Sequence, residues 1–219
     1  MTLAPELPGA AEVIDLLVER GVVVSLGHSS ASADEASTAV GRGATCVTHL
    51  FNAMSPLHHR APGLAGVALS DARLHVGLIA DGIHVHPAVV SIAQRALGDR
   101  LVLVTDAVAA LGIPGGAHRL GGADVTVGPD GVRLADGTLA GSDLSMERAV
   151  QNLVAFAGCS AAAALRAASA APAAVLGDGG RGSFSNGARG DVVVLTEDLD
   201  VVATIVAGRV VRPAGAGQP

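Results

Sequence analysis

Short apolar runs alternate with amphipathic segments along the first half of the chain. The apolar runs suit strands buried on both faces and cover 22–26, 44–50, 75–80 and 101–105, with a shorter one at 2–4. Between them, apolar residues at helical spacing predict helices over about 8–20, 33–43 and 87–98. Capping-box spacing at Ser32 and Glu35 and a first-turn proline at Pro87 mark two of the helix starts. This alternation predicts parallel βα units in an α/β fold.

The second half of the chain departs from this pattern. Short antiparallel strands are expected at 120–127 and 131–135, within an excursion over 115–141. Helices follow at about 143–157 and 160–170, and Pro172 is expected to stop the second. Residues 177–190 are rich in Gly and Ser and predict a linker. The last portion, 191–219, predicts two or three strands, with a hairpin at Ala207 and Gly208.

Polar residues follow successive strands of the first half. His28, His49, Asp81 with His84, and Asp106 each come at the carboxyl end of an apolar run. Enzymes built on a β/α barrel assemble their sites at this end of the strands. No strand is followed by the Gly-rich phosphate loop that an open dinucleotide-binding sheet prefers. The sequence therefore favours a barrel over an open doubly wound sheet.

The two strand-end histidines indicate a metal site. Neutral imidazole is a preferred ligand of zinc-like ions, and His28 and His49 follow consecutive strands. A carboxylate at Asp106 can bind such an ion or take a proton from its water. Each residue alone has a structural alternative, because a single strand-end His commonly makes a hydrogen bond and an Asp commonly caps a turn. Their joint occurrence favours metal chemistry.

Composition narrows the function classes further. The chain has 219 residues, of which 50% are hydrophobic, enough for a sizeable core. Its net charge is −6, and all 14 basic residues are arginines scattered along the chain, which argues against nucleic acid as a partner. No apolar run approaches the roughly 18 residues of a membrane helix. Two distant cysteines, Cys46 and Cys159, favour a reducing cytoplasm.

Taken together, the motifs of this chain resemble one family over nearly its whole length. They are LAPE (3–6), VVVSLGHSSA (22–31), THLFNAMSPLHHRAPGLAG (48–66), GLIADGIHVHP (77–87), LVTDAVAA (103–110), DGTLAGSDLSM (136–146), GARGDVVVLT (187–196) and TIVAGRVV (204–211). The order and content are similar to the N-acetylglucosamine-6-phosphate deacetylases of the amidohydrolase superfamily. The resemblance implies a metal-dependent β/α barrel carrying a small β-sandwich. It also implies hydrolysis of the N-acetyl amide of N-acetyl-D-glucosamine 6-phosphate to D-glucosamine 6-phosphate and acetate.

The resemblance also implies roles for individual residues. His28 and His49 match the family's histidine metal ligands, with Zn²⁺ as the expected ion and one or two ions per subunit. Asp106 matches the catalytic aspartate. The implied substrate contacts are Asn52, Ala53, Arg60, His84, Leu139, Ala140 and Gly141. Arg60 matches an arginine that pairs with the 6-phosphate and reaches across a dimer interface, so a homodimer is implied.

Two of these contacts have plain structural alternatives. Asn52 can serve only its own loop, as Asn does in turns, and Arg60 can be a solvated surface cation. Neighbouring His58 and His59 receive no role.

The chain departs from the family pattern at its start. Its first strand corresponds to about the fourth strand of the barrel, so we expect a partial barrel of about strands 4 to 8 over 1–176, the catalytic domain, with 191–219 as remnant strands of the β-sandwich. The family's glutamate metal ligand lies upstream of the LAPE motif, so Glu6 is not assigned to the metal. Three explanations fit this departure: a fragment of a longer gene product, a true start upstream, or a decayed remnant. The first two are favoured, because the metal and catalytic positions of this part of the family pattern are all retained.

Two other functions remain open. One is another amidohydrolase that acts on a cyclic amide or a dipeptide, which would have no need of the loop from Asn52 to Arg60. The other is a non-enzymatic half-barrel that only associates with a partner.

Overall fold

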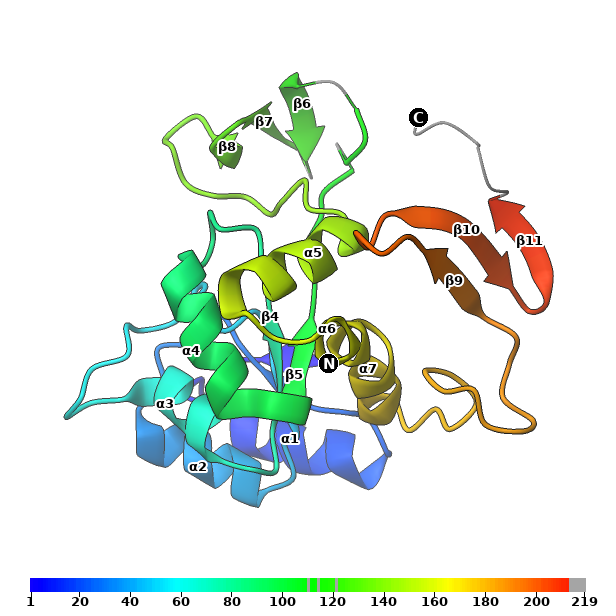
Figure 1. Cartoon of the computed structure of the whole chain (residues 1–219). Helices are drawn as coiled ribbons and strands as arrows, with labels where there is room; N and C mark the ends of the chain where they lie inside the picture. Colours follow the sequence, from blue (N-terminus) through cyan, green and yellow to red (C-terminus); the bar gives the residue numbers. More distant parts are fainter. Residues whose placement is uncertain (110, 114, 121, 213–219) are drawn as a thin grey trace.

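A parallel sheet of five short strands organises the first half of the chain (Figure 1). The computed structural model describes residues 1–109, 111–113, 115–120 and 122–212. The strands of this sheet are β1 (Thr2–Leu3), β2 (Ser25–Leu26), β3 (Cys46–Val47), β4 (His75–Leu78) and β5 (Leu101–Leu103). They pair in sequence order, each parallel to the next. Every βα unit therefore advances in the same direction, without the reversal of strand order found in doubly wound sheets.

Helices connect these strands and pack against them. They are α1 (Ala10–Glu19), α2 (Ala33–Gly41), α3 (Gly63–Ser70) and α4 (Pro87–Leu97), followed by a 3₁₀ turn, η1 (Gly98–Arg100). Ile14 of α1, Val40 of α2 and Val90 of α4 join strand residues such as Leu26 and Val76 in one core cluster. Burial of these apolar faces is the main favourable term for the fold.

The predicted helix starts are confirmed. At α2, the Ser32 hydroxyl accepts a hydrogen bond from the Glu35 amide (3.3 Å), and the Glu35 carboxylate accepts one from the Ser32 amide (2.8 Å). At α4, Pro87 occupies the first turn, and the His86 ring accepts a hydrogen bond from the Ala88 amide (3.2 Å). Local capping chemistry therefore decides where both helices begin.

Helix α3 was not predicted. It lies within the long segment between β3 and β4, where the sequence suggested only a loop. Its residues Leu64, Ala65, Val67 and Ala68 are all buried, so apolar side chains face nearly every direction. A helix without a polar face has no periodic pattern from which it can be recognised.

The excursion after β5 forms a three-stranded antiparallel sheet. It contains β6 (Gly116–Leu120), β7 (Ala123–Gly128) and β8 (Gly131–Leu134), in the order β6-β7-β8. Val125, Val127 and Val132 form a small core of its own. The single strand predicted at 120–127 is wrong, because β6 ends and β7 begins within that range; Gly121 lies outside the described residues.

Three helices follow the excursion, α5 (Met146–Ala157), α6 (Ala161–Ala168) and α7 (Ala170–Val175). The expectation that Pro172 stops the second helix is wrong. Helix α6 ends earlier, at Ala168, where Ser169 adopts φ −135° and ψ −72°. Pro172 then lies in the first turn of α7, where an amide N–H has no helical acceptor and its absence costs nothing.

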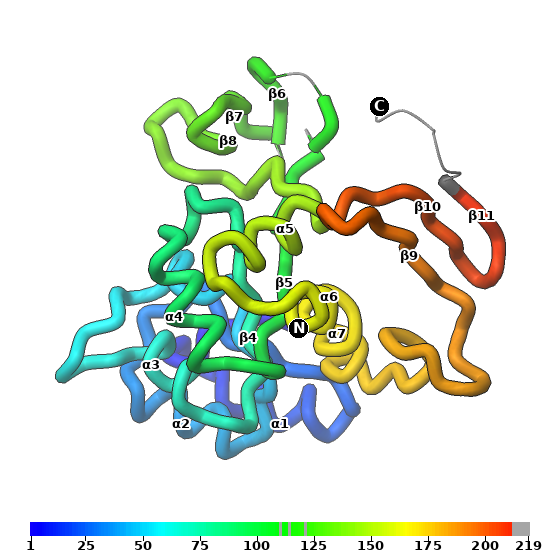
Figure 2. The backbone as a smooth tube through the Cα atoms, in the orientation of Figure 1, coloured from blue at the N-terminus to red at the C-terminus, as the bar shows by residue number. Residues whose placement is uncertain are grey.

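A second antiparallel sheet closes the chain. Residues 177–190 contain no helix or strand, and the strands that follow are β9 (Val192–Leu195), β10 (Val201–Val206) and β11 (Arg209–Arg212), in the order β11-β10-β9. The predicted hairpin at Ala207 and Gly208 is confirmed, with φ of 49° and 76°. Figure 2 shows this sheet set to the side of the parallel sheet, with α5 to α7 between. Residues 213–219 of the predicted C-terminal portion lie outside the described residues.

None of the helices described here is long and apolar enough to cross a membrane.

The first prediction concerns Arg100, whose guanidinium donates to the carbonyls of Ala68 (3.1 Å), Leu69 (2.9 Å) and Leu74 (2.9 Å) at the end of α3 and the start of β4. The change Arg100→Met leaves these carbonyls without a donor. We expect the free energy of unfolding to fall by about 2 kcal/mol, measured by urea denaturation.

Arg95→Met is the matched control, because Arg95 is an exposed residue of the neighbouring helix α4. An equal loss in both variants would contradict a specific role for Arg100.

Candidate active site

Three predicted site residues follow strands of the parallel sheet and share an unusual backbone. His28 follows β2, His49 follows β3 and Asp106 follows β5, so parallel pairing brings them to one edge of the sheet. Their φ angles are 50°, 27° and 50°, in the left-handed region that residues other than glycine rarely adopt. Such backbone strain persists only where surrounding contacts enforce it, and it is concentrated at functional sites.

The structure brings the two predicted imidazole ligands together. The Nε2 atoms of His28 and His49 lie 2.9 Å apart, and the ring centroids are 4.6 Å apart. His49 is only 6% exposed, and its Nδ1 is buried with no hydrogen-bond partner in the described structure. Burial lowers the pKa of His49, an effect strengthened by the neighbouring His28 and opposed by Asp106. The neutral form that binds metals is therefore favoured.

The donor set fits part of a metal site. A tetrahedral zinc-like ion takes four ligands, and with bonds of about 2.0–2.1 Å it would hold two Nε2 atoms about 3.3–3.4 Å apart. The observed 2.9 Å is slightly shorter, so the two rings lie near two such positions. Within the described ranges, no three His, Cys, Asp or Glu side chains form a group that could hold an ion. The chain therefore presents a pair of imidazole donors rather than a closed set, and Asp106 does not complete it.

Asp106 shares a cavity with His49. The cavity has a volume of about 510 Å³ and is lined by Met1 and by residues within or next to β2 to β5 and α7. The predicted substrate loop is tied to the same place, because the Ser142 amide donates to the Asp106 carbonyl (2.9 Å) and the Val108 amide donates to the Ser142 carbonyl (2.9 Å). Leu139, Ala140 and Gly141 lead directly into this contact.

Gly141 is required at this junction. Its φ is 78°, and a Cβ atom there would lie 2.9 Å from the Asp106 carbonyl oxygen. Any larger residue would push the substrate loop away from the segment that carries Asp106.

Asp81 and His84 form a second polar pair, in the loop after β4. The His84 Nδ1 lies 2.6 Å from the Asp81 Oδ2, and their side chains are 5% and 8% exposed. Burial raises the pKa of Asp81, but hydrogen bonds from the His84 side chain and from the Ile83 and His84 amides outweigh it. The net pKa lies below its ordinary value, so Asp81 is ionised near neutral pH.

The predicted phosphate loop has a more open setting. The Asn52 amide group donates to the Leu50 carbonyl (3.2 Å), so the turn-stabilising alternative for Asn52 is present. The Ala53 carbonyl accepts from the Ser29 amide (2.9 Å), which joins this loop to the residue after His28. Arg60 is exposed, with its Nη1 2.7 Å from the His59 ring.

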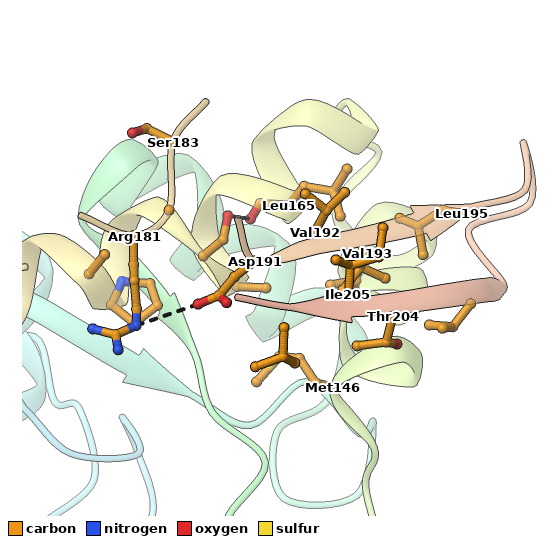
Figure 3. A pocket seen from close by; sticks show the side chains of 18 of the residues that line it. Met146, Leu165, Arg181, Ser183, Asp191, Val192, Val193, Leu195, Thr204 and Ile205 are labelled. Atoms are coloured by element: carbon orange, nitrogen blue, oxygen red, sulfur yellow. Dashed lines mark hydrogen bonds and ion pairs between the residues drawn. The ribbon is translucent and has the colours of Figure 1, made fainter. Parts of the chain in front are cut away.

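A larger cavity than that of His49 and Asp106 lies elsewhere, and none of the predicted site residues lines it. It has a volume of about 710 Å³ and lies between α5 to α7 and the strands β9 and β10 (Figure 3). Its lining is mostly apolar, apart from groups such as Arg181 and Asp191, which face one another with 3.5 Å between Nε and Oδ2. Because none of the predicted site residues lines it, this cavity is not the candidate active site.

Comparison with known proteins identifies the family of this chain. A model of the amidohydrolase family matches residues 6–211. The chain belongs to the amidohydrolase family.

Its relatives are deacetylases of amino sugar phosphates. N-acetylglucosamine-6-phosphate deacetylase of Homo sapiens is 46% identical over 100% of this chain and 55% of its own length. N-acetylgalactosamine-6-phosphate deacetylase of Escherichia coli O157:H7 is 43% identical over 95% of this chain and 56% of its own length. This amidohydrolase chain therefore spans about half the length of the curated relatives it matches.

Solved structures agree on the fold. The N-acetylglucosamine-6-phosphate deacetylase of Thermotoga maritima has a TM-score of 0.92 at 38% identity, covering 97% of this chain and 59% of that protein. A mutant of the Mycobacterium smegmatis enzyme in complex with N-acetyl-D-glucosamine-6-phosphate has the same TM-score at 41% identity, covering 96% and 57%. An enamidase at 12% identity, with a TM-score of 0.62, shares the fold alone.

Sequence reasoning missed one residue of this amidohydrolase site. Glu6 follows β1, and its carboxylate accepts hydrogen bonds from the Ser29 hydroxyl (2.6 Å) and the Ser30 amide (2.6 Å). It therefore holds the loop that carries His28. The sequence did contain a signal for this contact. Glu6 is an acidic residue at the end of β1, and Ser29 and Ser30, which follow the neighbouring strand β2, are hydrogen-bond donors.

The second prediction follows from this contact. In Glu6→Gln the charge-assisted hydrogen bonds become neutral and one of them is lost. We expect a fall of about 1–2 kcal/mol in the free energy of unfolding, measured by urea denaturation.

The control is Glu197→Gln in the exposed turn between β9 and β10, which should change stability by less than about 0.5 kcal/mol. If both variants behaved alike, Glu6 would have no anchoring role.

Proposed function

We propose that this chain carries the metal-binding and proton-transfer half of a deacetylase that hydrolyses the N-acetyl group of N-acetyl-D-glucosamine 6-phosphate to D-glucosamine 6-phosphate and acetate. The observation that supports this most directly is the approach of His28 and His49 to within 2.9 Å, beside the cavity that His49 shares with Asp106. The relatives named for this reaction supply the substrate class.

The architecture proposed for this function is a partial β/α barrel. Residues 1–176 form the catalytic domain with about strands 4 to 8, 177–190 the linker, and 191–219 strands of a small β-sandwich. Support comes from the sequential order of the five parallel strands and from relatives that extend well beyond the matched region. The division also agrees with the absence of helices and strands in 177–190.

His28 and His49 would hold a divalent ion, with Zn²⁺ expected and one or two ions per subunit. A bound ion of this kind polarises a carbonyl oxygen and makes water a better nucleophile at neutral pH. The Asp106 carboxylate accepts a proton from the attacking water and returns it to the departing amine. One carboxylate thus serves as base in the first half-step and as acid in the second.

The remaining predicted residues bind the substrate. Asn52, the Ala53 backbone and Arg60 contact the sugar phosphate, since a guanidinium pairs well with phosphate. His84 and the loop of Leu139, Ala140 and Gly141 contact the sugar and the acetyl group. The exposed position of Arg60 agrees with a place near a homodimer interface. The two free cysteines agree with a cytoplasmic enzyme.

The third prediction concerns metal binding. Two imidazoles without a third protein ligand should bind Zn²⁺ weakly, and His49→Gln should reduce that affinity at least about tenfold. Isothermal titration with Zn²⁺ and metal analysis after gel filtration measure both effects.

His59→Gln is the control, because His59 is exposed on the loop of Arg60. Tight stoichiometric binding by this chain would contradict the incomplete donor set.

The fourth prediction concerns substrate choice. Acetate release should be faster from N-acetylglucosamine 6-phosphate than from N-acetylglucosamine, and Asp106→Asn should lower the rate by about 10²-fold or more. The same assay with N-acetylgalactosamine 6-phosphate tests whether this chain prefers the substrate named for the Escherichia coli O157:H7 relative.

Equal rates of acetate release from the phosphorylated and the unphosphorylated sugar would favour the alternative of an amidohydrolase that acts on a cyclic amide or a dipeptide. A folded, zinc-loaded chain with no acetate release would favour the non-enzymatic half-barrel.

A further inference from the structure

The buried pair of Asp81 and His84 is more constrained than a simple ion pair. Besides the contact of its Oδ2 with His84 Nδ1, the Asp81 Oδ1 accepts hydrogen bonds from the Ile83 amide (2.8 Å) and the His84 amide (2.8 Å). Both oxygens of the carboxylate are therefore occupied, and the side chain cannot rotate without losing several bonds. Asp81 is fixed by the same short loop that carries His84.

This geometry decides which nitrogen of His84 carries a proton. An ionised carboxylate only accepts hydrogen bonds, so the Nδ1 that lies 2.6 Å from it must be the donor. In a neutral imidazole the other nitrogen, Nε2, is then an acceptor. Within the described structure, Nε2 of His84 has no hydrogen-bond partner, and it is not among the fully buried unpaired atoms. It is therefore free to receive a donor from a ligand.

The loop of this pair lies at the edge of the candidate site. Strand β4 is the neighbour of both β3 and β5, so its loop emerges between His49 and Asp106. Gly131 lies between this loop and the substrate loop. A Cβ atom on Gly131 would lie 3.2 Å from the side chain of Leu139, in the substrate loop, and 3.4 Å from that of Ile83, between Asp81 and His84. The Asn152 amide group holds the start of the loop by donating to the Ala80 carbonyl (2.8 Å).

We propose that Asp81 is a positioning residue that keeps the proton of the His84 imidazole on Nδ1, so that Nε2 offers a hydrogen-bond acceptor to a ligand hydroxyl. An acceptor nitrogen repels the oxygens of a phosphate. We therefore assign His84 to a hydroxyl group of a sugar phosphate, and the phosphate group itself to other residues. The choice of a sugar phosphate as ligand rests on the proposed function. The tautomer does not, because it follows from the contacts within the loop.

Imidazole nitrogens labelled with ¹⁵N test the tautomer directly. Long-range ¹H–¹⁵N spectra near pH 7.5 distinguish the two neutral tautomers and the imidazolium, and His84→Gln identifies the signals of His84. In the unmodified chain we expect a protonated Nδ1 and an unprotonated Nε2. A proton on Nε2, alone or together with Nδ1, would overturn the proposal, and this measurement needs no other variant to fold.

Asp81→Asn tests the role of the carboxylate. The Asn carbonyl can keep the two amide bonds while its NH₂ group faces Nδ1 as a donor, so the proton should move to Nε2. Asp136→Asn is the matched control, since Asp136 also accepts a backbone amide, that of Thr138 (2.9 Å), but is exposed. It should leave the His84 signals unchanged. An unchanged tautomer in a folded Asp81→Asn protein would also overturn the proposal.

Addition of N-acetylglucosamine 6-phosphate tests the ligand. We expect the Nε2 signal to shift in the unmodified chain and in Asp136→Asn, and the dissociation constant to rise about five- to tenfold in Asp81→Asn. If the tautomer is as expected but the ligand binds without moving the Nε2 signal, the acceptor role is wrong. If no binding occurs at all, the proposed function fails while the tautomer assignment stands.

Discussion

Parallel pairing of β1 to β5 is the constraint on which the site depends. Because the strands run in the same direction and in sequence order, the residues that follow them emerge at a single edge. His28, His49 and Asp106 then need only a sharp turn after their strands, and each takes it with a positive φ. The strain is sustained by hydrogen bonds on either side, such as that between the Ser142 amide and the Asp106 carbonyl.

A common arrangement supports the groups proposed to do the chemistry. Glu6 binds the loop of His28, and Asp81 binds His84. Each carboxylate accepts a hydrogen bond from at least one backbone amide and from one side chain. Charge-assisted bonds of this kind are short and directional, and they leave little freedom to the loop. The groups proposed to touch an ion or a ligand are thus held in place by neighbouring carboxylates.

The incomplete donor set agrees with the extent of the chain relative to its family. Amidohydrolase relatives continue well beyond the matched region, and this chain presents two imidazoles without a third ligand in the described structure. In the proposed deacetylase reaction, the two imidazoles would therefore supply part of the metal site.

The sequence by itself determined the order of βα units, the caps at Ser32 and Pro87, the hairpin at Ala207 and the placement of site residues after strands. All of these depend on periodicity or on chemistry within a few residues. Only the tertiary structure decided that α3 is a helix and that Pro172 lies inside one, because burial on all sides and position within a turn leave no periodic signal. The 2.9 Å approach of the two imidazoles, the anchoring by Glu6 and the direction of the Asp81–His84 bond likewise join separate loops or depend on side-chain geometry that spacing does not encode.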